Sequence, residues 1–154
     1  MDSSGDLGSV LGVPELTLPQ AAGPAAGPLG LDPRIVWAVG GEASGDAPGR
    51  LTVASLIATR AKLAGVDPAS IVTEPGQFES LDPDHLPVNQ KRFPVGSPQY
   101  QALEAQIAPI ITGAQPPIAS YTGFRTHGAA SGWNGKAPIT TVGGNDFATV
   151  PYKY

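Results

Sequence analysis

The chain has 154 residues, 41% of them hydrophobic and 14% charged, which is enough for one small domain with a modest core. Its net charge of -4, without a cluster of Lys or Arg, argues against binding nucleic acid or an anionic membrane surface. It has no cysteine and two histidines, so we expect neither a disulfide, nor a metal site, nor a cofactor.

The first 30 residues differ in composition from the rest. The N-terminus carries acids where a signal peptide carries positive charge, so we expect no cleavable signal, and no apolar run approaches the roughly 20 residues of a membrane span. Residues 19–30 are rich in Gly, Pro and Ala and lack periodicity. Residues 1–30 are interpreted either as a flexible leader or as an arm that orders against a partner protein.

Residues 31–154 are predicted to form a single α+β domain, mainly helical, with short C-terminal strands. Asp or Ser before Pro predicts helix starts, and apolar residues at steps of three and four predict helix bodies. Helices are expected from Pro33 until Gly40-Gly41 weakens the first of them, from Ala47 to about Ala64, over Ser70–Val72, and from Pro98 to Gly113. A long surface loop is expected over Glu74–Gly96, and strands over Ile118–Thr122, Ile139–Val142 and Phe147–Val150.

Glu42 is the leading candidate for chemistry. It ends the first apolar segment, where the negative pole of a helix and partial burial both favour the protonated carboxyl that a general acid needs. The alternative is a solvated residue in a turn. Asp46 follows across a turn, where it can cap the next helix, and Glu79 lies in the predicted loop, so neither forms a clear catalytic pair with Glu42.

Other candidates are polar or aromatic groups that can contact a sugar. Arg60 ends an apolar helix and can orient a sugar or remain a solvated cation. Gln77 and Phe78 form an amide and aromatic pair that can bind a sugar face, while a packed Phe78 that anchors the loop is the alternative. Trp133 is either a sugar platform or an anchor of a small core.

The order of these motifs resembles the spore-cortex-lytic cell-wall hydrolases (SleB-type), including their phage-borne relatives. The resemblance covers about residues 32–151. The matching stretches are Glu42-Ala43-Ser44-Gly45-Asp46, Gly49, Val53-Ala54, Thr59-Arg60, Gly76-Gln77-Phe78, Trp133 and Val142-Gly143-Gly144-Asn145-Asp146-Phe147.

The chain departs from that family in three places. Thr59 replaces the usual Asn, and Asn145 stands where the family usually has His. Residues 122–126 are similar to a Thr-His-Tyr-His-Thr segment without its histidines, with Phe124 in place of the Tyr. The acid is retained and several polar groups around it are not.

The resemblance implies a lysozyme-like domain that cleaves the β-1,4 bond between N-acetylmuramic acid and N-acetylglucosamine as a lytic transglycosylase. Glu42 would be its catalytic acid and base, and Arg60, Gln77, Phe78, Phe124, Trp133 and Asn145 would bind the glycan strand. A phage tail component with residues 1–30 against other virion proteins is expected, and an endolysin released to the cell wall is a further possibility. The alternative is a structural tail or baseplate subunit that keeps the fold without the activity.

Overall fold

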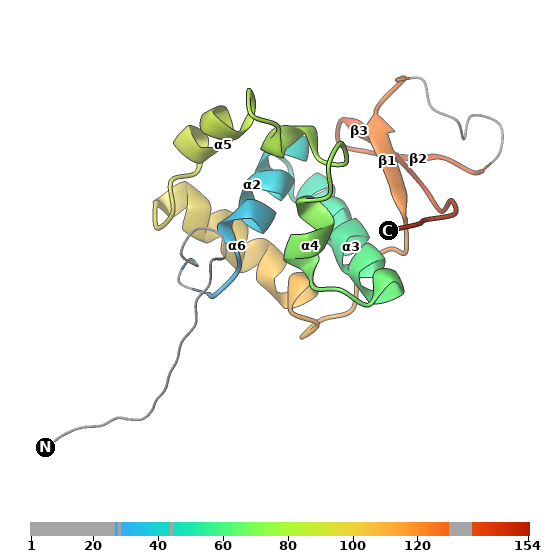
Figure 1. The fold of residues 1–154 in the computed structure, drawn as a ribbon, viewed down its shortest axis with the longest axis horizontal. Coiled ribbons are helices and arrows are strands. Elements are labelled where there is room, and N and C mark those ends of the chain that lie inside the picture. Colours follow the sequence, from blue (N-terminus) through green and yellow to red (C-terminus); the bar gives the residue numbers. More distant parts are fainter. Residues whose placement is uncertain (1–26, 28, 44, 130–136) are drawn as a thin grey trace, which may run out of the picture.

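The computed structural model describes residues 27, 29–43, 45–129 and 137–154, in which the helices come first and the strands last (Figure 1). The elements are α2 (Pro33–Glu42), α3 (Ala47–Ala64), α4 (Pro68–Val72), the 3-10 turn η1 (Glu79–Leu81), α5 (Leu86–Arg92), α6 (Pro98–Ile111), β1 (Gly123–Thr126), β2 (Thr140–Val142) and β3 (Asn145–Ala148). The described helices include none that is long and apolar enough to cross a membrane. A mainly helical fold with short C-terminal strands is confirmed for these residues.

The helices α2, α3, α4 and α6 begin where an Asp or Ser precedes a proline by one or two residues. In each case the side-chain oxygen accepts a backbone N–H of the first turn, and the proline fixes a helical φ. The accepting and donating residues are Asp32 and Arg34, Asp46 and Gly49, Asp67 and Ser70, and Ser97 and Tyr100. The predicted starts at Pro33, Ala47 and Pro98 are confirmed, and Asp46 is a cap. The helix expected from Ser70 begins at Pro68.

The helix α2 packs against α3, α4, α5 and α6, and Figure 1 shows it among them. It continues through Gly40 and Gly41, where the sequence predicted a weakened helix, and ends at Glu42. A Cβ on Gly40 would lie 2.7 Å from the ring of Phe93, and one on Gly41 would lie 2.7 Å from Nδ2 of Asn89. The two glycines therefore allow the α5 region to approach α2 closely.

The segment 74–96 contains η1 and α5, so the prediction of a long surface loop was wrong. Its buried groups include polar ones, because Ser80 and Asn89 are each 5% exposed. The Ser80 hydroxyl donates to the carbonyl of Ala38 in α2, and Nδ2 of Asn89 donates to the carbonyl of Ser80. Buried polar residues of this kind are satisfied by hydrogen bonds but give no hydrophobic signal in a sequence.

The strands form an antiparallel sheet in the order β1-β3-β2. In its register Phe124 of β1 lies opposite Phe147 of β3, and their ring centroids are 6.2 Å apart. The ring of Phe124 also contacts that of Phe78, at 5.4 Å. These three rings attach the sheet to the helical part of the domain.

The strand predictions were right for part of the sheet. Ile139–Val142 overlaps β2, and Phe147–Val150 overlaps the second half of β3. Ile118–Thr122 is not a strand, since β1 begins at Gly123. The amide of Ile118 instead donates to the hydroxyl of Ser55 in α3 at 3.0 Å. The backbone N–H of Ile118 therefore bonds to a helix side chain and not to the carbonyl of a neighbouring strand.

The predicted arm of residues 1–30 lies almost wholly outside the described residues. Just before α2, the side chain of Glu104 in α6 accepts hydrogen bonds from the amides of Leu29 and Leu31, at 3.3 and 3.2 Å. The Glu104 side chain is fully buried. A buried carboxylate thus fixes the point at which the chain enters the domain.

Candidate functional site

Glu42 lies at the C-terminal end of α2, as predicted, and both its side chain and its backbone are held. Oε2 accepts the backbone N–H of Ser80 at 2.7 Å. The carbonyl accepts Nδ2 of Asn145 at 2.8 Å. Glu42 is therefore fixed between η1 on one side and the start of β3 on the other.

The surroundings of Glu42 favour its protonated form. Burial is the largest cause and raises the pKa of the carboxyl above its ordinary value, while the hydrogen bonds from Ser80 act in the opposite direction. The negative charges of Glu79 and Asp82 raise the pKa further. A carboxyl of this kind retains its proton to a higher pH and can serve as a general acid.

Glu42 opens into a cavity of about 210 Å³ between the end of α2, η1 and α5. This Glu42 cavity is lined by Gly41, Glu42, Glu79, Ser80, His85, Val88, Asn89 and Arg92. Sequence reasoning did not assign Glu79, His85 or Arg92 to a site, because it placed all three in a loop. The helix α5, which the sequence did not predict, brings Arg92 and its N-cap His85 to the wall of the cavity.

Asn145 supports the backbone of Glu42. Its side chain is buried, with the residue 6% exposed, and its amide donates to the Glu42 carbonyl. That carbonyl belongs to the last turn of α2 and has no partner within the helix. The sequence interpretation placed Asn145 in the site, and the structure brings it against Glu42 as a positioning residue.

Arg60 and Gln77 contact each other, and neither lines the Glu42 cavity. Nη1 of Arg60 donates to Oε1 of Gln77 at 3.3 Å, and Nε donates to the carbonyl of Thr122 at 2.8 Å. The guanidinium also lies over the ring of Tyr152, 4.7 Å from its centroid. Arg60 is 6% exposed, and burial lowers its pKa, so the alternative of a solvated cation was wrong. It connects α3 to the segment before β1.

The two predicted aromatic contacts, Phe78 and Phe124, belong to the row of rings that joins the sheet to the helices. Phe78 is 2% exposed, so its ring is the packed anchor that the sequence left as an alternative. Phe124 is half-buried against it. Trp133 lies outside the described residues.

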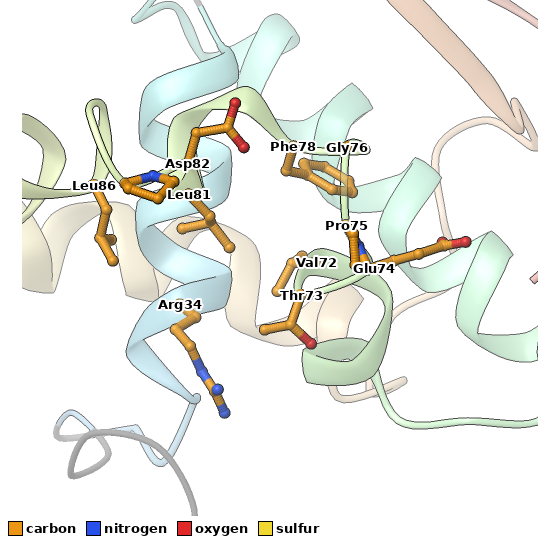
Figure 2. Close-up of a pocket in the computed structure, with 11 residues that line it drawn as sticks. Arg34, Val72, Thr73, Glu74, Pro75, Gly76, Phe78, Leu81, Asp82 and Leu86 are labelled. Carbon is orange, nitrogen blue, oxygen red and sulfur yellow. The ribbon is translucent and has the colours of Figure 1, made fainter.

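A second pocket, of about 330 Å³, is lined by residues of α2, α4, η1 and α5 (Figure 2). Glu79 and Ser80 line the Glu42 cavity, whereas Leu81 lines this pocket. In Figure 2 its charged groups point apart: the guanidinium of Arg34 and the carboxylates of Glu74 and Asp82 lie in three different directions. Specific ligand sites have polar groups that converge, so the Glu42 cavity is the better candidate.

A further cluster, centred on Asp146, lies on the sheet. Its carboxylate is 3% exposed and accepts four hydrogen bonds, from His127 Nδ1 and Thr141 Oγ1 at 2.7 Å, Arg125 Nε at 3.1 Å and the amide of Gly128 at 3.2 Å. These bonds, that of His127 foremost, lower the pKa of Asp146. His127 and Asp146 are 19 residues apart in the sequence, and the pairing of β1 with β3 brings them together.

Comparisons of this chain with protein-family models, with curated proteins and with solved structures found no match. The functional proposal therefore rests on the geometry around Glu42 and on the motifs of the sequence.

Proposed function

We propose that the protein is a peptidoglycan-cleaving glycosidase with a lysozyme-like fold that acts on the β-1,4 bond between N-acetylmuramic acid and N-acetylglucosamine. The observation that carries the proposal is Glu42: a largely desolvated carboxyl with a raised pKa, held by a backbone amide at the edge of a polar cavity. This is the environment that keeps a glycosidase acid protonated near neutral pH.

The proposed reaction begins when Glu42 gives its proton to the glycosidic oxygen and the bond to the anomeric carbon breaks. Ser80 holds Oε2 through its amide, so that the carboxyl keeps one orientation while it loses the proton. In a lytic transglycosylase the same carboxylate then takes the proton of the muramic 6-hydroxyl, which closes a 1,6-anhydro ring. A single acid is enough for this sequence of steps, unlike the two carboxylates of most glycosidases.

The proposed setting is a phage tail, where the enzyme would open the cell wall locally during entry. The support is the resemblance to the phage-borne cell-wall hydrolases, together with residues 1–30, whose composition suits an arm that binds other virion proteins. Immunogold labelling of purified particles tests the location.

The catalytic proposal is tested with Glu42→Gln, which keeps the shape and the acceptor for the Ser80 amide but cannot donate a proton as an acid. We expect clearing of peptidoglycan in a zymogram to fall by at least about 10²-fold, the usual contribution of general acid catalysis. Asp84→Asn, at an exposed carboxylate between η1 and α5, serves as the matched control. Circular dichroism verifies the fold of each variant, and unchanged clearing by Glu42→Gln would exclude this site.

A specific observation favours the second candidate, a tail or baseplate subunit that keeps the fold without the reaction. The Glu42 cavity, at about 210 Å³, is smaller than the roughly 300–1,000 Å³ of most small-molecule sites. Arg60 and Phe78 are also buried in packing contacts. A folded wild-type protein that leaves purified peptidoglycan intact, yet is present in particles, would establish this alternative.

A further inference from the structure

The Glu42 cavity has a second carboxylate in its wall. Glu79 is the first residue of η1, and the next residue, Ser80, gives its amide to Oε2 of Glu42. The two acids come from different elements, one from the end of α2 and one from η1, and both line the same cavity. The short bond from Ser80 therefore fixes the backbone of Glu79 beside the carboxyl of Glu42.

The two acids have different surroundings. The carboxyl of Glu42 is largely removed from water, whereas Glu79 is exposed and lines the same cavity. The negative charge of Glu79 is among the causes that raise the pKa of Glu42. Unequal surroundings of two neighbouring carboxyls are the arrangement in which one acts as an acid and the other as a base or nucleophile.

We propose that Glu79 is a second catalytic carboxylate, which activates a water molecule and makes the reaction a hydrolysis. The proposal rests on the function proposed above and keeps Glu42 as the acid, but attack of water takes the place of the ring closure that needs Glu42 alone. In the step, Glu79 takes a proton from water and the water oxygen bonds to the anomeric carbon. The bond from that carbon to the glycosidic oxygen breaks, and Glu42 gives that oxygen its proton. The products are a reducing sugar end and a free 4-hydroxyl.

The remaining charged or titratable groups in the wall of the cavity are His85 and Arg92, from the α5 side. Asp82 also raises the pKa of Glu42, but it lines the second pocket and not the Glu42 cavity. Asp82 therefore shares with Glu79 the effect of its charge on Glu42 but not the place in the cavity wall, which makes it the matched control.

The experiment compares Glu79→Gln with Asp82→Asn and Glu42→Gln on purified glycan strands, using the full-length protein. We expect Glu79→Gln to lower kcat by about 10²–10⁴-fold, the range for loss of a general base, and to leave KM within a few-fold. Asp82→Asn should keep kcat within a few-fold and move only the pH profile. Added azide, a small anion that can replace the attacking water, should restore glycan cleavage in Glu79→Gln and form a glycosyl azide, which a merely structural role of Glu79 would not produce.

Mass spectrometry of the wild-type products should show reducing ends, which are heavier by one water than 1,6-anhydro ends. If Glu42→Gln is inactive while Glu79→Gln keeps the wild-type rate, or if the wild-type products are only anhydro ends, the role of Glu79 is overturned and that of Glu42 stands. If the folded wild-type protein does not cleave the strands, both proposals are overturned. Thermal melting curves verify that each variant is folded.

Discussion

Glu42 and Asp146 are two carboxylates of this domain that are largely removed from water, and their surroundings move their pKa values in opposite directions. Around Glu42 burial outweighs the hydrogen bonds from Ser80, and the pKa is raised. Around Asp146 four donors converge, among them His127 and Thr141, and the pKa is lowered. The number of donors that face the charged form thus decides the direction of the shift.

The difference separates a site that can do chemistry from one that holds the fold. A buried carboxyl with few hydrogen-bond donors stays protonated to a higher pH and can act as an acid. Glu42 is such a carboxyl, and it also lines a cavity. A carboxylate surrounded by donors is ionised and fully committed to them, as Asp146 is to the ends of β1 and β2. The two regions are connected through β3, since Asn145 donates to the Glu42 carbonyl and the next residue of the strand is Asp146.

The largest expected loss of stability comes from Asp146→Asn. The amide keeps one oxygen and places N–H atoms where the other was. The variant therefore loses either Oδ1, the acceptor for His127 and Thr141, or Oδ2, the acceptor for Arg125 and Gly128. We expect a lower melting temperature for Asp146→Asn than for the control Asp67→Asn, which is the same substitution at an exposed helix cap.

The sign of the pH dependence follows from the lowered pKa of Asp146. Its contribution to stability is fully present above the unfolded value, which is about 3.9, and it is lost as the pH falls through the folded value. The difference in melting temperature between wild type and Asp146→Asn should therefore be constant near neutral pH and shrink in acid. A difference that does not depend on pH would contradict the assignment.

The next effect in size is that of Asn145→Ala, which removes the donor to the carbonyl of Glu42. A buried carbonyl without its partner costs about 1–3 kcal/mol, and we expect this loss in the free energy of unfolding from urea titrations. Asn145→Asp is the matched comparison, since it keeps the size but not the donor. Wild-type stability in both variants would show that the contact between α2 and β3 does not position Glu42.

The sequence predicted what is decided locally. The caps at Asp32, Asp67 and Ser97 and the position of Glu42 at a helix end depend on residues within one turn. The contacts among the rings of Phe78, Phe124 and Phe147 could not be predicted, because they depend on the register of the sheet.

What the sequence did not predict depends on tertiary contacts between polar groups. The segment with η1 and α5 was missed because Ser80 and Asn89 are buried through hydrogen bonds and not through hydrophobicity. For the same reason Glu79 was placed in a loop, although η1 places it in the wall of the Glu42 cavity. The pairing of His127 with Asp146 depends on strand register, which short β-prone segments leave undetermined.

The smallest expected effect on stability is that of Glu42→Gln. Its sign is opposite to that expected for Asp146→Asn. The folded protein disfavours the ionised form of Glu42, so ionisation costs stability as the pH rises from the ordinary value of 4.5 towards the raised folded value. A glutamine carries no charge and still accepts the Ser80 amide, so the variant should be more stable than wild type at neutral pH, by on the order of 1 kcal/mol. Below the ordinary value both side chains are neutral and the two melting curves should coincide. Asp84→Asn, at an exposed position, is measured alongside as the control and should not be more stable than wild type at neutral pH. If Glu42→Gln is less stable than wild type at neutral pH, then Glu42 resembles Asp146 after all, and its carboxylate is a structural acceptor and not a poised acid.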